Sequence, residues 1–144
     1  MGTSRNKRSN TNRQGSEDFM IRNILAIDDS AAMRQIISAT LTAAGYEVTV
    51  ASDGEEGLEN ALAVQFDLVL TDQHMPRVSG LDLIGRLRRN PAYQTTPILL
   101  LTTEDSEPFK DAARAAGATG WIEKPVDPDL LTDLVASLSE QEAS

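Results

Sequence analysis

A chain of 144 residues is long enough for one domain with its own hydrophobic core. It holds no cysteine and one histidine, which excludes disulfides, thiolate chemistry, and cysteine-based or histidine-rich metal sites. The net charge is −9 and no apolar run approaches the roughly 20 residues that span a bilayer, so we expect a cytoplasmic protein without membrane insertion or a direct nucleic-acid partner.

The first segment, residues 1–20, differs in composition from the rest. It carries four bases and two acids among Ser, Asn, Thr and Gly, with almost nothing to bury, and is predicted to be a disordered basic extension. The remaining residues hold nine bases and twenty acids. Met20 can also serve as a native start, which would make the preceding residues a leader. We assign residues 21–141 to one domain and 142–144 to a tail.

Strand-like and helix-like patterns alternate from residue 23 onward. An apolar run over 23–28 precedes a helix capped by Ser30, and Gly45 suits the left-handed end of that helix. Its apolar positions follow a helical spacing: Met33, Ile36, Ile37, Leu41 and Ala44. A second strand is expected over 46–50, and a second helix, with acids in its first turn, over 52–64.

The second half continues the alternation. A buried strand over 66–71 ends on Asp72, and a loop through Pro76 and Gly80 leads to a helix over 81–90. Strand 97–102, helix 107–116 with Gly117 at its end, and strand 119–123 follow. Asp127-Pro128 starts a last helix, whose inward positions are predicted to be Leu131, Leu134, Val135 and Leu138.

Five strand–helix repeats with short loops predict an α/β fold of the (βα)5 type, a doubly wound parallel five-stranded sheet with helices on both faces. In such sheets the ligand site lies beyond the carboxyl ends of the strands. Chemistry-bearing residues stand at those ends: Asp28, Asp29, Asp72, Thr102 and Lys124. Three close carboxylates need a compensating charge, and Mg²⁺ prefers such oxygen ligands. With a lysine and a hydroxyl, the set has what phosphoryl transfer to a carboxylate requires.

These residues carry a family resemblance. "AIDDS", "TDQHMPRVSGLDL", "PILLLTT" and "GATGWIEKP" together resemble the receiver domains of two-component response regulators, closest to CheY-like single-domain members of the chemotaxis type. The resemblance spans about residues 21 to 141. Each motif is weak alone, but the ordered set is specific. The family has a flavodoxin-like fold with strand order 2-1-3-4-5, which the resemblance implies for this chain.

The resemblance also implies roles for the site. Asp72 matches the phosphoryl acceptor and Lys124 the phosphate-binding lysine, with Pro125 following through a cis peptide bond. Asp28, Asp29 and Asp72, with the main-chain carbonyl of His74, match the ligands of Mg²⁺.

Further positions match the parts of a receiver that respond to phosphorylation. Thr102 matches the switch hydroxyl. Trp121 occupies the switch-aromatic position, where Tyr or Phe is usual, and packing in the core is an equal alternative. The side chains of His74 and Glu104 border the water path and are expected to tune the phosphoryl lifetime. Lys110, Arg114 and Trp121 lie on the family's output surface.

The function implied is a phosphorylation-controlled switch. A CheA-like histidine kinase would phosphorylate Asp72, and the expected target is a protein such as a flagellar motor switch protein, with a phosphatase as a further partner. We expect a monomer that is not an enzyme beyond its own phosphorylation and dephosphorylation, and, with no segment after the last helix, signalling by protein binding. A phosphorelay intermediate or phosphate sink is an alternative within the class.

An alternative from another class is a Mg²⁺-dependent phosphohydrolase that forms an aspartyl phosphate. It should carry an acid two residues after the nucleophile, where this chain has His74, and a substrate cap that the short loops cannot build. A nucleotide-binding module is disfavoured because neither G-x-G-x-x-G nor G-x-x-x-x-G-K-[ST] occurs.

Overall fold

The computed structural model describes residues 20–143, with side chains described as far as Ser139, so most of the predicted basic extension and the end of the predicted tail lie outside the described part. Strands and helices alternate throughout. Their order is β1 (Asn23–Ile27), α1 (Ala31–Ala43), β2 (Glu47–Ala51), α2 (Gly54–Ala63), β3 (Leu68–Asp72), α3 (Gly80–Arg88), the 3-10 helix η3 (Pro91–Tyr93), β4 (Ile98–Thr102), α4 (Glu107–Ala116), β5 (Gly120–Glu123) and α5 (Pro128–Ala143).

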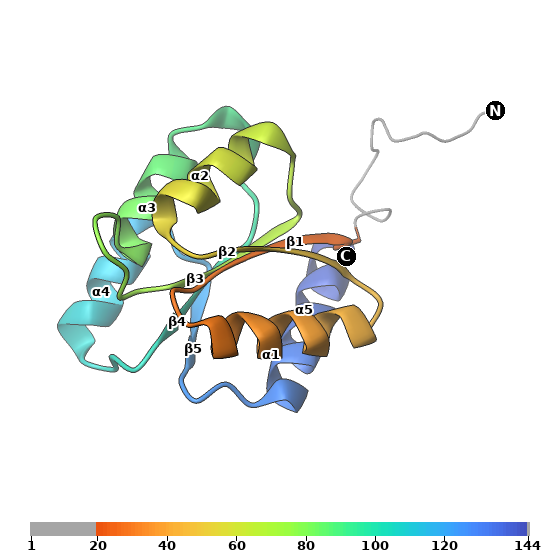
Figure 1. Ribbon diagram of the computed structural model, residues 1–144. Helices are drawn as coiled ribbons and strands as arrows, with labels where there is room; N and C mark the ends of the chain where they lie inside the picture. Colours follow the sequence, from red (N-terminus) through yellow and green to blue (C-terminus); the bar gives the residue numbers. More distant parts are fainter. Residues whose placement is uncertain (1–19, 144) are drawn as a thin grey trace.

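The five strands form one parallel sheet in the order β2-β1-β3-β4-β5. Helices α1 and α5 cover one face, and α2, α3 and α4 cover the other (Figure 1). The predicted doubly wound fold and its strand order are therefore confirmed. From β1 the chain winds to β2 on one side and then crosses to β3 on the other, so the winding direction reverses between β1 and β3. The crevice beyond the carboxyl ends of these two strands is where such sheets bind ligands.

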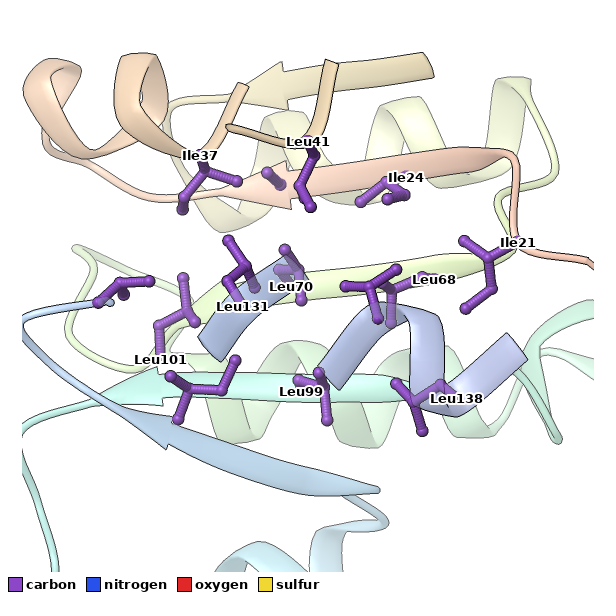
Figure 2. Close-up of a cluster of buried hydrophobic side chains, with 14 residues drawn as sticks. Ile21, Ile24, Ile37, Leu41, Leu68, Leu70, Leu99, Leu101, Leu131 and Leu138 are labelled. Atoms are coloured by element: carbon purple, nitrogen blue, oxygen red, sulfur yellow. The ribbon is translucent and has the colours of Figure 1, made fainter. Parts of the chain in front are cut away.

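Two hydrophobic clusters hold the helices to the sheet, because successive strand residues point to opposite faces. In β1, Ile24 and Ala26 belong to the cluster under α1 and α5, whereas Leu25 and Ile27 belong to the cluster on the other face. Figure 2 shows the first cluster, in which helical side chains lie over those of the central strands: Ile37, Leu41, Leu131 and Leu138 over Ile24, Leu68, Leu70, Leu99 and Leu101. The central strands are apolar on both faces for this reason.

Helix ends follow the predicted local chemistry. The side chain of Ser30 accepts a hydrogen bond from the N–H of Met33 and so caps α1, as predicted. Gly45 and Gly117 have φ values of 103° and 105°, the left-handed conformation expected after α1 and α4. Among the described residues, no helix is both long and apolar enough to cross a membrane.

Some predicted boundaries and faces are wrong. The third strand begins at Leu68 and includes Asp72, since Phe66 lies before the β1–β3 ladder, with its N–H donating to the hydroxyl of Tyr93. Helix α3 begins at Gly80 rather than in the following residue, because Ser79 caps it with a reciprocal Asp82 capping box. Ile36, predicted on the apolar face of α1, is exposed, because neighbouring Ile37 takes the inward direction.

Candidate functional site

Three aspartates meet at the carboxyl edge of the sheet. Asp28 follows the last residue of β1, and Asp72 ends the neighbouring β3. Asp28, Asp29 and Asp72 each offer a carboxylate oxygen, and these oxygens all lie within 4.8 Å of one another. Asp28 and Asp72 are buried and Asp29 is exposed, so the cluster opens to solvent on the side of Asp29.

Lys124 joins this cluster from the end of β5. Its Nζ lies 3.0 Å from Asp28 Oδ2 and 3.0 Å from Asp72 Oδ1, and it donates a hydrogen bond to the latter. The lysine side chain is 20% exposed, and those of the two aspartates are 0% and 6% exposed. The peptide bond that follows, between Lys124 and Pro125, is cis.

The two carboxylate oxygens of Asp28 have different partners. Its Oδ1 accepts a 2.9 Å hydrogen bond from the N–H of Ser30. Its Oδ2 is buried and, despite the short contact with Lys124, has no partner in hydrogen-bond geometry among the described residues. A buried acceptor left in this way calls for an explanation, and a bound ion is one. The donors present are carboxylate oxygens, which suit a hard cation such as Mg²⁺.

Burial shifts the acid–base behaviour of the pocket. It raises the pKa of Asp72 above the ordinary 3.8, and the charge of Asp28 raises it further, while Lys124 and the N–H of His74 lower it without cancelling the rise. Burial alone would lower the pKa of Lys124, but its hydrogen bond with Asp72, its 3.0 Å contact with Asp28 and the charges of both carboxylates outweigh it, so the pKa is raised. Lys124 therefore stays charged beside a carboxylate that has few hydrogen-bond donors.

Thr102 lies at the tip of β4, beside the pocket. Its buried hydroxyl accepts a 2.9 Å hydrogen bond from the N–H of Glu104, so it is engaged with the β4–α4 loop, and no hydrogen bond joins it to Asp72 among the described residues. The neighbouring positions on β5 are Glu123, opposite Thr102, and Trp121, opposite Leu100. The three acids and the lysine are thus brought together as predicted, while the Thr102 hydroxyl is bonded to the β4–α4 loop.

Trp121 lies between the sheet and α4. It packs against the cluster of α2, α3 and α4, and is only partly buried. Two cations of α4 lie over its ring, Arg114 Cζ at 5.3 Å and Lys110 Nζ at 6.0 Å from the centroid. The three residues predicted to form the output surface are therefore brought together. Trp121 is neither fully buried nor free at the surface, and its role as a switch stays a prediction.

His74 and Glu104 meet from two different loops. His74 Nε2 lies 3.6 Å from Glu104 Oε2, and the two side chains are 63% and 41% exposed. One follows β3 and the other follows β4, so the pair lies at the same edge of the sheet as Asp72. The role of the His74 carbonyl as a cation ligand and that of the pair in phosphoryl lifetime stay predictions.

The contacts of two arginines were missed in the sequence, and one of them reaches the site. Arg34 donates a 2.8 Å hydrogen bond from Nη1 to the carbonyl oxygen of Asp28. Arg77, in the β3–α3 loop, has a φ of 69° and forms 3.2 Å ion pairs with Asp53 and Glu55 at the start of α2. The sequence did hold one signal for Arg34. It is a base in the first turns of a helix, where the helix dipole disfavours cations, and this indicates that the arginine binds something else.

Comparison with known proteins decides the family. Residues 24–136 match the model of the response regulator receiver domain. The chain belongs to this family. It is 37% identical over 112 residues to chemotaxis protein CheY1 of Helicobacter pylori, covering 76% of this chain and 90% of that protein.

Solved structures agree with this assignment. Chemotaxis protein CheY4 of Vibrio cholerae is 42% identical with a TM-score of 0.78, covering 81% of this chain and 98% of that one. A response regulator of Burkholderia multivorans is 67% identical with a TM-score of 0.72, covering 83% and 96%. The protein is thus a CheY-like receiver domain of two-component signalling, a class of signalling proteins rather than classical enzymes.

Proposed function

We propose that this receiver is a switch controlled by phosphorylation of Asp72. The observation that carries the proposal is the buried Asp72 carboxylate, with the Lys124 ammonium at 3.0 Å and two further acids within 4.8 Å. A carboxylate in this setting has a cation to receive the charge of an incoming phosphoryl group and acids to hold a metal. Asp72 is at a strand tip, where a donor can approach.

Each residue has a distinct part in the proposed reaction. A carboxylate oxygen of Asp72 bonds to the phosphorus of a kinase phosphohistidine as the phosphorus–nitrogen bond breaks. The Lys124 ammonium then binds a phosphoryl oxygen, and the Thr102 hydroxyl leaves the N–H of Glu104 to donate to another. Asp28, Asp29, Asp72 and the His74 carbonyl would hold Mg²⁺, which supplies positive charge to the phosphoryl oxygens when bound.

The proposed partners follow from the relatives. Two of them, from Helicobacter pylori and Vibrio cholerae, are named as chemotaxis proteins. We therefore place this receiver downstream of a CheA-like kinase and upstream of a protein target such as a flagellar motor switch protein. The face with Trp121, Lys110 and Arg114 is the proposed output surface, because it lies one strand away from Thr102.

Intact-mass measurement after incubation with Mg²⁺ and a small phosphodonor tests the acceptor. We expect one phosphoryl increment that is base-labile, depends on Mg²⁺, and is lost in Asp72→Asn. Asp105→Asn is the matched control, because Asp105 is exposed in the β4–α4 loop. Modification of Asp72→Asn to the extent of the wild type would end the assignment, and a pull-down with and without a phosphoryl mimic tests the partner.

A further inference from the structure

Arg34 reaches from helix α1 back to the acidic cluster. Its Nη1 donates a 2.8 Å hydrogen bond to the main-chain carbonyl oxygen of Asp28. Side chains on a helix lean toward its N-terminus, so a long side chain that begins one turn after the cap Ser30 can reach the end of β1. The guanidinium therefore binds the peptide unit that joins Asp28 to Asp29.

That peptide unit determines where the Asp29 side chain starts. A peptide bond is planar, so fixing the carbonyl of Asp28 also fixes the nitrogen and Cα of Asp29. Asp28 is held besides by its N–H, which donates to Ala51, and by its Oδ1, which accepts from Ser30. Asp29 is exposed, and the described residues give its carboxylate no hydrogen bond or ion pair. Its orientation depends on the peptide that Arg34 holds.

Helix stability does not account for Arg34 at this position. A cation near a helix N-terminus is disfavoured by the helix dipole, and α1 has no acid in its first turn to offset it. No ion-pair partner for Arg34 is found among residues 20–139. Its charge also lies on the side of the cluster that is to bind a cation, where it opposes binding by Coulomb repulsion.

We propose that Arg34 is a positioning residue for the cation site. It orients the Asp28–Asp29 peptide so that the Asp29 carboxylate faces Asp28 and Asp72, and this gain exceeds the repulsion between the guanidinium and the bound cation. The inference rests on the proposed function, in which these three acids hold Mg²⁺. Groups that orient metal ligands commonly contribute 10- to 100-fold to affinity.

The test is the Mg²⁺ affinity of the full chain, measured by isothermal titration and by competition with Mn²⁺ in electron paramagnetic resonance. Arg34→Met keeps the apolar stem and removes the donors and the charge. We expect it to bind Mg²⁺ about 10-fold more weakly, at both low and high salt. Arg22→Met is the matched control: it makes the same charge change on an exposed residue at the opposite end of β1, and should bind as the wild type does.

The sign of the change separates the two roles of Arg34. If only its charge mattered, Arg34→Met would bind Mg²⁺ more tightly than the wild type, and this difference would fade in salt. Either tighter binding or unchanged affinity would overturn the proposal. Arg34→Lys keeps the charge, so any weakening in this variant also speaks for geometry. Circular dichroism checks that the variants are folded. If the wild type binds no Mg²⁺, the proposed function itself fails. If the wild type binds Mg²⁺, and this affinity is lost in Asp29→Asn but kept in Arg34→Met, only this inference fails.

Discussion

Lys124 offsets the charge of two buried carboxylates, and its removal leaves them without compensation. We expect Lys124→Met to lower the free energy of unfolding by about 3 kcal/mol in urea denaturation with EDTA, since breaking a buried ion pair on one side strands a charge. Added Mg²⁺ should restore part of the loss. Lys110→Met is the control, because Lys110 contacts the Trp121 ring and should lose about 1 kcal/mol or less. Equal losses in the two variants would contradict this account.

Folding disfavours the ionised form of the Asp72 carboxyl, because burial raises its pKa. Because its pKa is raised above 3.8, the native state binds more protons than the unfolded state just above that pH, and stability falls as the pH rises through this window. Asp72→Asn should therefore stabilise the cation-free protein at neutral pH by about 1 kcal/mol. The gain should shrink as the pH is lowered and vanish below 3.8, where the carboxyl becomes protonated in both states. Urea denaturation at several pH values measures it, and a gain independent of pH would refute the burial argument.

At the scale of elements, the first residue of α3, Gly80, lies very close to the end of β3, and this contact fixes the loop between them. A Cβ on Gly80 would lie 2.5 Å from the carbonyl oxygen of Asp72 and 2.8 Å from Leu100, whereas a Cβ on Gly85 meets nothing within 4 Å. Gly80 also donates from its N–H to the carbonyl of Gln73. The start of α3 is therefore pressed against the residue that carries the acceptor carboxylate.

The two glycines of α3 form a matched pair of variants. Gly80→Ala should destabilise the protein by about 2 kcal/mol, because the backbone of β3 or α3 must shift to admit the methyl group. Gly85→Ala should stabilise it by about 0.5–1 kcal/mol through helix propensity. Thermal unfolding of both variants measures the difference, and Gly80→Ala with wild-type stability would show that the contact yields without cost.

At the scale of the whole molecule, the site is assembled from strands at different places in the chain, so a bound cation should stabilise the entire fold. Saturation with Mg²⁺ at 100 times its dissociation constant should add about 2.7 kcal/mol to the free energy of unfolding. EDTA should reverse the effect. Thermal unfolding with and without Mg²⁺ measures it, and Asp29→Asn should abolish most of it; an equal shift in that variant would place the cation elsewhere.

The sequence alone determined the elements and the residues at their tips. The alternation of apolar runs and amphipathic helices fixed the fold class, since periodicity is a local property of the chain. Cap residues such as Ser30 and Gly117 marked helix ends through local hydrogen bonds and backbone conformation. Asp28, Asp72 and Lys124 were found because parallel strands bring their carboxyl ends to one edge. Strand order came from the family resemblance, because nothing local distinguishes one winding from another.

Only the tertiary structure decided which groups touch. Lys124 bridges Asp28 and Asp72 because the register of the sheet sets Asp28 beside Asp72 and places Lys124 two residues beyond the same level on β5, a matter of pairing across the sheet. Thr102 was expected in the pocket, and its hydroxyl accepts a hydrogen bond from the N–H of Glu104, a contact that depends on the path of the β4–α4 loop. The hydrogen bond from Arg34 to Asp28 and the contacts of the α4 cations with the Trp121 ring depend on how each helix packs against the sheet. Such contacts depend on packing between distant segments, which local pattern does not specify.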